Sequence, residues 1–438
     1  MQLWHVSLID SAHGGTTGEV PVPAANVGHG SQDIQPEVGV TSTPVIDPAT
    51  ATIYVLSKSI NASTTFFQRL HALAMTTGEE KFNAPVNLAA SVPGTGDGGS
   101  TVSFDLQNQH ERSALALVNV NLSNVVYIAS ASHEDQGPYH GWVLGYAAGN
   151  VSQQAGVFNT TANSGLGGIW MNGGAPAADP SGNLFLATGN GQFDGDSSAQ
   201  PNNDFGDSVL KLDATTSLTL TDWFTPEDQL NLENNDTDLG SGGVTLLPDQ
   251  PSGRVSHLLV SAGKEGLIYL INRDNMGRYH SNDHNQIVQS FSAVNSSFGT
   301  PAFWQNNLYY AGAGGPLQRF EFNPTSGLFT PSPSSQSSHT FPFPGATASI
   351  SSQAAANGIA WVLDTAQFGA PSPLLSGPAV LYAYDATDLN TELWDSSQAA
   401  GGRDQAGVAV KFVPPTVANG KVYVSTRSEI DVYGLLPN

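Results

Sequence analysis

The sequence predicts an all-β protein: a β-propeller of seven, or alternatively eight, four-stranded blades in a single domain over residues 1–438. Three observations lead to this prediction. A pattern of paired short apolar strands recurs along the chain, long amphipathic helical windows are absent, and the composition is uniform, with no charge run that would mark a linker. A pair of β-sandwiches and an irregular β-helix are the alternatives that remain open.

The recurring unit is a Pro or small residue, a short apolar strand, a turn with Gly or Asn, and a second apolar strand rich in Tyr and Val. The clearest copies are residues 43–56, 175–186, 300–310 and 415–424, and looser copies lie near 125–128, 257–260 and 360–363. Most copies are followed by a further strand, such as residues 209–213 or 381–385. Strands separated by turn residues form hairpins, and regular repeats of such units are typical of propellers.

Several smaller expectations follow from the same reading. Residues 430–435 and 3–6 are expected to share one blade and so close the ring. One short helix is expected near residues 226–232. The Gly-rich and Ser-rich stretches 93–100 and 331–338 are interpreted as long surface loops.

The net charge of the chain limits the classes of partner that it can bind. The chain has 37 acidic and 14 basic residues, which gives a formal net charge of −23. A field of this sign repels phosphate backbones and anionic lipid surfaces, so we expect no nucleic-acid partner. No stretch approaches the ~20 apolar residues that a membrane-spanning helix needs.

The absence of cysteine excludes disulfides, thiolate zinc sites and covalent haem attachment. Sequons weakly favour secretion, and the first residues lack the charged and apolar regions of a leader. We therefore expect an acidic, extracytoplasmic protein, periplasmic or secreted, from which a leader has been removed. The sequons begin at Asn61, Asn121, Asn150, Asn159, Asn235 and Asn295.

Residues 167–273 contain most of the polar motifs that could bear chemistry. In chain order they include Gly167-Gly168-Ile169-Trp170, Gly189-Asn190, a polar loop with Asp236 and Asp238, and Lys264-Glu265-Gly266 followed by Asn272-Arg273. In a propeller, loops from successive blades converge over the central channel. A Trp, an Asn, an Asp and a Lys from successive blades are therefore expected to meet there.

In order and approximate spacing, this segment resembles the quinoprotein alcohol dehydrogenases, which bind pyrroloquinoline quinone (PQQ) in a PQQ-like propeller. The resemblance implies that Trp170 is the platform for the quinone, Asn190 a calcium ligand and Asp236 the catalytic base. It also implies that Lys264 contacts the quinone. A second calcium ligand is expected at Asp135 or Glu134, and the sequence leaves open which of them fills it.

These residue types suit that chemistry. An aromatic side chain supports a flat quinone, carboxylate and amide oxygens bind Ca²⁺, and a carboxylate accepts the alcohol proton. Asp238 and Arg403 lie in loops expected to face the channel and are further candidates for cofactor binding. Arg403 could also pair with its neighbour Asp404.

Each motif also has a structural explanation. Trp170 could close a blade core, Asn190 could serve a hairpin turn, and Asp236 and Asp238 could be solvated. Lys264 at an apolar strand end needs a partner in any case. The segment also departs from the family pattern. The cysteine pair that caps the quinone in many of these enzymes is absent, its counterpart being residues 29–33, and Asn235 stands where a Trp usually precedes the base.

Two functions are therefore expected. The first is a PQQ- and Ca²⁺-dependent dehydrogenase that oxidises an alcohol or a sugar hydroxyl. The alternative is a non-catalytic extracytoplasmic propeller that serves as a glycan- or protein-binding platform, as other PQQ-like propellers do. A further cluster, His133-Glu134-Asp135 with Tyr139-His140, is either a divalent-ion site or a polar loop.

Overall fold

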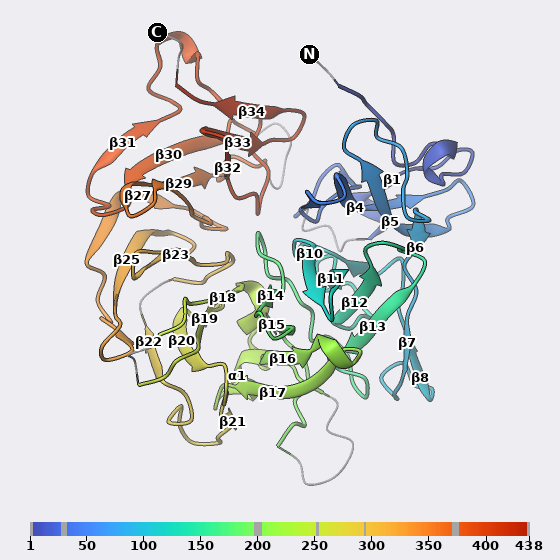
Figure 1. Ribbon diagram of the computed structural model, residues 1–438, viewed down its shortest axis with the longest axis horizontal. Helices are drawn as coiled ribbons and strands as arrows, with labels where there is room; N and C mark the ends of the chain where they lie inside the picture. The colour runs from blue at the N-terminus through green and yellow to red at the C-terminus, as the bar shows by residue number, and fades with distance from the viewer. Residues whose placement is uncertain are drawn as a thin grey trace. The chain divides into compact units, whose positions relative to one another are not determined.

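The computed structural model describes residues 3–27, 33–196, 204–250, 254–292, 295–369 and 376–435. The chain divides into two compact units, Met1–Asp236 and Thr237–Asn438, and Figure 1 shows their strands in chain order. Each unit is built from successive antiparallel sheets, as the alternation of apolar strands and turn residues predicts.

The first unit contains three larger sheets and a small hairpin. The first sheet has the order β2-β1-β4-β5-β6 with β3 on β4, the second runs β10-β11-β12-β13 with β9 on β11, and the third runs β14-β15-β16-β17. The hairpin is β7-β8. The bounds are β1 (Val20–Pro23), β2 (Glu37–Val38), β3 (Val45–Asp47), β4 (Thr52–Ile60), β5 (Phe66–Ala74), β6 (Val86–Asn87), β7 (Ser91–Pro93), β8 (Thr101–Ser103), β9 (Gln109–His110), β10 (Ala116–Val120), β11 (Ser123–Ser132), β12 (Trp142–Ala147), β13 (Gln154–Asn159), β14 (Ala177–Ala178), β15 (Asn183–Ala187), β16 (Val209–Asp213), β17 (Thr219–Thr225) and α1 (Gln229–Asn234).

The second unit contains four sheets. They run β18-β19-β20-β22, β23-β24-β25-β26 with β27 on β25, β28-β29-β30-β31, and β32-β33-β34. The bounds are β18 (Val244–Leu246), β19 (Leu258–Ala262), β20 (Leu267–Asn272), β21 (Arg278–Tyr279), β22 (Gln289–Ser292), β23 (Ala302–Trp304), β24 (Asn307–Ala311), β25 (Gly315–Asn323), β26 (Leu328–Phe329), β27 (Ser335–Phe341), β28 (Ser349–Gln353), β29 (Ala356–Asp364), β30 (Val380–Asp385), β31 (Glu392–Asp395), β32 (Thr416–Ala418), β33 (Lys421–Ser425) and β34 (Ile430–Tyr433). Seven successive sheets of three or more strands are thus present in the described residues, and the fold is the predicted seven-bladed β-propeller.

The hydrophobic cores lie between neighbouring sheets. In the first unit, Tyr54 and Leu70 from the first sheet pack with Val126 and Trp142 from the second, and all four are fully buried. Central strands such as β4 are buried on both faces, which explains their nearly continuous apolar runs. The recurring strand pattern is therefore the pattern of stacked blades.

Two local expectations are corrected by the structure. Residues 3–6 form no strand; instead Trp4 Nε1 donates to the carbonyl of Met75 at 2.8 Å, and the last sheet has only the three strands β32-β33-β34. The predicted closing strand is therefore wrong, because the Trp side chain finds its partner within the first unit. The stretch 331–338 is also not all loop, since β27 begins at Ser335.

The short helix expected near residues 226–232 is confirmed as α1, one turn later than predicted. Among the described residues, no helix combines the length and apolar character that crossing a membrane requires.

Candidate functional site

Trp170 lies in a loop between β13 and β14 that approaches neighbouring backbone very closely. Gly189 N–H donates to the carbonyl of Gly168 at 2.8 Å. A Cβ on Gly168 would come within 2.9 Å of the Ala131 side chain, so this approach requires glycine. The Gly-Gly pair before Trp170 thus lets the loop carry the indole inwards, where Trp170 is only 7% exposed.

Two side chains cover Trp170. The ring of Tyr139 meets the indole edge-on at 6.3 Å between centroids, and the guanidinium of Arg112 lies over the indole at 5.1 Å. Arg112 also pairs with Asp33, with Nη2 3.2 Å from Oδ2. Sequence reasoning missed Arg112, because a single Arg outside any motif gives no signal. Of the predicted cap region 29–33, residues 29–32 lie outside the described residues.

Asn190 and Asp236 are brought together as the sequence order predicted. Asn190 Nδ2 donates to Asp236 Oδ1 at 3.0 Å, although 46 positions separate them. Asp236 is exposed and sits at a left-handed φ of 52°. Gly167 N–H donates to the carbonyl of Asn190 at 2.5 Å, which ties this pair to the loop that carries Trp170.

The loop after β15 explains how Asn190 is held. β15 ends at Ala187 and β16 begins at Val209, so Asn190 and Gly191 lie in a long loop and not in a two-residue hairpin turn. Gln229 of α1 donates through Nε2 to the carbonyl of Gly191 at 2.7 Å. The short helix α1 therefore anchors the loop on which Asn190 stands.

Glu134 and Asp135, the two candidates for the second calcium ligand, point to different partners. Both adopt left-handed backbone, with φ of 56° and 53°. Glu134 Oε1 accepts from Asp33 N–H at 2.9 Å, and its side chain is only 5% exposed. Asp135 is exposed and accepts from Tyr139 Oη at 2.6 Å. Glu134 is thus the inward-facing carboxylate of the two.

Behind Glu134 lies a buried group of ionisable side chains, here called the Lys58 cluster: Lys58, His110, Glu111 and His133. The His110 and His133 rings meet edge-on at 5.4 Å. Burial holds the pKa of His110 well below its ordinary value and lowers the pKa of His133 to about 4. Burial also raises the pKa of Glu111 to about 7, against the opposing attraction of Lys58. No sequence motif indicated this cluster.

In the second unit, Lys264 has the partner that its position required. Its Nζ lies 2.5 Å from Asp238 Oδ2, and its backbone N–H donates to the Asp238 carbonyl at 2.9 Å. Asp238 is only 5% exposed. A Cβ on Gly263 would lie 2.3 Å from that carbonyl, so the Gly before Lys264 permits the contact. The structure therefore places both predicted quinone contacts, Asp238 and Lys264, in one ion pair.

Arg403 lies in an exposed segment after η6 (Ala400–Gly402). Its Nε and Nη2 donate to the two carboxylate oxygens of Asp404 at 2.6 and 2.7 Å, and its side chain is 60% exposed. The hydrogen bonds that Arg403 donates to Asp404 raise the pKa of Arg403. The pairing with Asp404 that the sequence suggested is confirmed.

The possible divalent-ion cluster separates in space. His133 joins the Lys58 cluster, whereas Nε2 of His140 lies 3.2 Å from Asp97 Oδ1. Within the described part of the chain, no three or more His, Asp or Glu side chains gather so as to hold a metal ion. The structure therefore does not gather these five residues at one point, and the choice between an ion site and a polar loop stays open.

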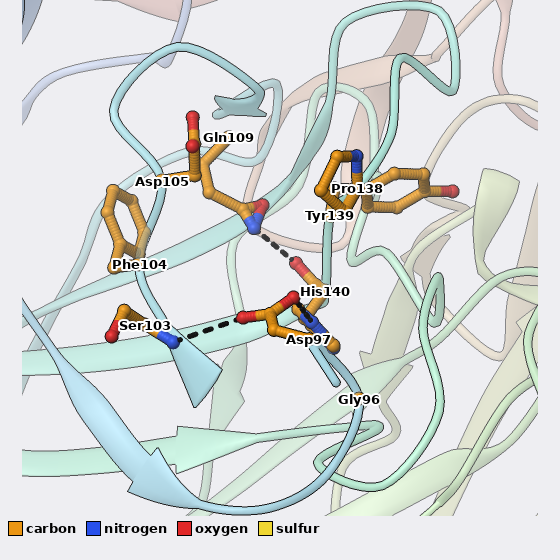
Figure 2. Close-up of a pocket in the computed structure, with 9 residues that line it drawn as sticks. All are labelled: Gly96, Asp97, Ser103, Phe104, Asp105, Gln109, Pro138, Tyr139 and His140. Carbon is orange, nitrogen blue, oxygen red and sulfur yellow. Dashed lines mark hydrogen bonds and ion pairs between the residues drawn. The ribbon is translucent and has the colours of Figure 1, made fainter. Parts of the chain in front are cut away.

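A cavity of about 440 Å³ opens beside His140 in the first unit (Figure 2). It lies next to the Trp170 loop through Tyr139, which belongs to both. None of the eight site residues predicted from the sequence lines it. Its lining residues are Gly96, Asp97, Ser103, Phe104, Asp105, Gln109, Pro138, Tyr139 and His140.

The chemical types of the side chains near Trp170 suit a quinone and a cation, although the described residues bring no three carboxylate or imidazole side chains together at one metal-binding position. Asn190, Asp236 and Glu134 offer the amide and carboxylate oxygens that Ca²⁺ takes as ligands. Arg112 offers a fork of donors that suits a carboxylate of the quinone. The indole itself is covered, so a planar ring would have to share the Trp170 face with Arg112.

No protein-family model matches the chain, and no curated protein matches it in sequence. Solved structures do resemble it. A quinohemoprotein alcohol dehydrogenase from Comamonas testosteroni superposes with a TM-score of 0.50 at 13% identity, over 93% of this chain and 72% of that one. BamB from Moraxella catarrhalis gives a TM-score of 0.49 at 12% identity, over 92% and 85%. A quinohemoprotein alcohol dehydrogenase from Pseudomonas putida HK5 gives 0.44 at 14%, over 90% and 70%.

The chain has a PQQ-like β-propeller fold. The match to the Comamonas enzyme extends over nearly the whole chain, which agrees with the seven sheets described above. At this level of identity the likeness concerns the fold, and function has to be argued from the residues of the site.

Proposed function

We propose that this PQQ-like propeller binds a planar, carboxylate-bearing quinone of the PQQ type together with Ca²⁺, and oxidises an alcohol or a sugar hydroxyl. The observation that supports it most is the hydrogen bond of 3.0 Å between Asn190 and Asp236. It puts an amide and an exposed carboxylate together at the loop that carries Trp170, in the order expected of a quinoprotein site.

In this proposal each residue has a distinct task. Asp236, exposed and acceptor-only when ionised, takes the proton from the substrate hydroxyl. Asn190 and the inward carboxylate Glu134, with Asp135 as the alternative, hold the cation. Trp170 supports the ring and Arg112 binds one of its carboxylates. The bound quinone supplies the carbonyl that accepts the hydride.

Asp238, Lys264 and Arg403 belong to the second unit, where Asp238 pairs with Lys264 and Arg403 pairs with Asp404. Their role as quinone contacts stays a prediction from the sequence. The substrate would be a small alcohol or carbohydrate, since a net charge of −23 disfavours anionic partners. We also propose an extracytoplasmic location for the protein.

The test is a titration of metal-stripped protein with PQQ, with and without CaCl₂, followed by absorbance and by dye-linked oxidation of alcohols and sugars. We expect calcium-dependent binding that weakens at least about tenfold in Asn190→Ala, and turnover that is lost in Asp236→Asn although PQQ still binds. Glu37→Gln, a change at an exposed acid in β2, is the matched control. Absence of binding at high micromolar PQQ would refute the proposal.

One observation favours the second candidate function, a non-catalytic binding platform for a glycan or a protein. Trp170 is 7% exposed and already has Arg112 over its ring, so the face of the indole is covered without a quinone. Under this alternative, Arg112→Ala leaves PQQ binding absent, whereas under the first it opens the indole and changes the PQQ affinity. The same titration therefore separates the two functions.

A further inference from the structure

We propose that the cavity of Figure 2 binds one neutral sugar residue, either free or at the end of a glycan. The inference does not depend on the quinone proposal, because none of the residues assigned to the quinone or the cation lines this cavity. Its volume of about 440 Å³ lies within the range of about 300–1,000 Å³ that is typical of small-molecule pockets.

The wall formed by the loop between β7 and β8 is built into the fold. Gly96 N–H donates to the carbonyl of Ala162 at 3.0 Å. A Cβ on Gly96 would lie 2.2 Å from the Ser164 carbonyl oxygen and 2.7 Å from His140 Cε1. Only glycine allows the loop to come this close, so the cavity is shaped by a specific backbone contact and not by a loose surface loop.

Gln109 supplies an acceptor that the protein itself leaves unused. The residue is 1% exposed, and its Nε2 donates to the carbonyl of His140 at 2.8 Å. Its Oε1 is buried and has no hydrogen-bond partner among the described residues. A buried acceptor without a partner is costly. Because Gln109 lines the cavity, we propose a ligand hydroxyl as the partner of this oxygen.

His140 and Asp97 are polar residues of the cavity lining. His140 is 2% exposed; its Nδ1 lies 3.0 Å from the Thr161 carbonyl oxygen, and its Nε2 lies 3.2 Å from Asp97 Oδ1. Among the described residues, the second oxygen of Asp97 has only a long contact of 3.4 Å from Ser103 N–H. Figure 2 draws this contact as a dashed line. This carboxylate, partly exposed at the rim, therefore retains acceptor capacity for hydroxyl groups.

The lining selects against charged anionic ligands and provides apolar surface. It contains the two carboxylates Asp97 and Asp105 and no Lys or Arg. Phosphates, sulfates and uronic acids would meet these carboxylates without a compensating cation. Phe104 and Pro138 add apolar faces, and the C–H face of a sugar ring packs on such surface while its hydroxyls bond to acceptors. A neutral polyhydroxyl ligand satisfies both features.

The test uses the full chain without quinone or turnover, so its result is independent of the dehydrogenase proposal. Isothermal titration and saturation-transfer NMR are run with neutral monosaccharides, with glucuronate, with glucosamine, and with CaCl₂ alone. We expect at least one neutral sugar to bind with a Kd of about 1 mM or tighter, and glucuronate to bind at least about tenfold more weakly.

Variants then assign the binding to the cavity. Asp97→Ala is expected to weaken the neutral sugar at least about tenfold and Asp97→Asn by less, because the amide keeps one acceptor. Glu37→Ala, which removes the same charge from an exposed position outside the cavity, leaves the affinity unchanged. Thermal melting shows whether each variant is folded. Binding that is insensitive to Asp97→Ala, binding of calcium alone, preference for glucosamine, or no sugar binding would each overturn the proposal.

Discussion

The two units bury different kinds of side chain. The second unit fills its cores with apolar and aromatic residues, such as Val260, Phe320 and Phe341. The described residues of the first unit bury many more ionisable groups. Those of the first unit are His13, Glu19, Asp47, Lys58, Arg69, His71, His110, Glu111, Arg112, His133, His140, Asp204 and Asp207, and those of the second are Asp238, Arg273 and Asp395.

This difference bears on where the two proposed ligand sites lie. Stacking one blade on the next needs only apolar faces, as the second unit demonstrates. Burying a charge costs free energy unless it is paired and hydrogen-bonded. The first unit therefore carries a larger cost of buried polar groups than the second, and both proposed ligand sites draw their principal residues from it.

Within the first unit, the buried charges themselves fall into two kinds. Glu19 is fully partnered: it accepts from Arg69, from Ser59 at 2.5 Å and from Thr16 N–H at 2.9 Å. Glu111 of the Lys58 cluster has a buried Oε1 without a hydrogen-bond partner. A carboxylate of the first kind stabilises the fold through its partners. A carboxylate of the second kind is buried at a cost in free energy, and the predictions below test this contrast.

The largest loss of stability is expected from Arg69→Met. The change leaves Glu19 buried and unpaired, which should lower the free energy of unfolding by about 3–5 kcal/mol. Arg273→Met in the second unit is the matched variant, because its partner Asp249 is 69% exposed and stays solvated. Urea denaturation followed by tryptophan fluorescence gives both values. Equal losses in the two variants would show that the comparison between the units is wrong.

The next largest loss of stability is expected from a change in the loop that forms the cavity wall. Gly96→Ala puts a methyl group 2.2 Å from a backbone oxygen, so we expect a loss of about 1–3 kcal/mol from overpacking, together with loss of sugar binding. Gly149→Ala is the control, since its Cβ would meet nothing within 4 Å. Denaturation and sugar titration of both variants are compared. A stable Gly96→Ala protein that still binds sugar would mean that the loop does not shape the site.

The pH dependence of stability should separate the two kinds of buried carboxylate. Burial alone would raise the pKa of Glu19, but hydrogen bonds from Arg69 and Ser59 lower it to about 2. Its stabilising contribution is therefore present above about pH 4.5 and is lost as the pH falls towards 2. The pKa of Glu111 is raised to about 7 instead, so its folded form keeps a proton and stability falls as the pH rises from about 4.5 to 7.

Two glutamine variants test these signs by thermal melting across pH. The Tm deficit of Glu19→Gln should be full at neutral pH and shrink below pH 4.5. Glu111→Gln should gain on wild type as the pH rises from about 4.5 to 7, because the amide has no proton to lose. Parallel pH profiles for the two variants would contradict the assignment of one carboxylate as paired and the other as unpaired.

Sequence reasoning found what local patterns and their order determine. Alternating apolar strands and Gly or Asn turns specified the blades, and the order of motifs brought Asn190 and Asp236 to one place. The closing strand predicted at residues 3–6 is absent, and Trp4 in this segment bonds to Met75 instead. The sequence of a short apolar run does not determine the sheet edge with which it pairs.

The cavity could not be found in this way. The composition of residues 93–100 predicts a surface loop, and nearness in sequence places His140 in one group with His133. The contacts that build the site join His140 to Asp97 and to Thr161, which lie 43 and 21 positions away. Such pairs have no fixed spacing in the sequence. They follow from how the β7-β8 hairpin loop lies against the strand ends.

The smallest effect is expected from Arg403→Ala. The guanidinium is 60% exposed and bonded only to its half-buried neighbour Asp404 in the described structure, and surface pairs of this kind contribute little. Its Tm and PQQ affinity should match wild type within error. Lys264→Ala, in contrast, leaves the buried Asp238 without its 2.5 Å partner and should lower the Tm. If Arg403→Ala instead weakened PQQ binding about tenfold, exposed loops of the second unit would take part in binding, and the assignment of the chemistry to the first unit would have to be given up.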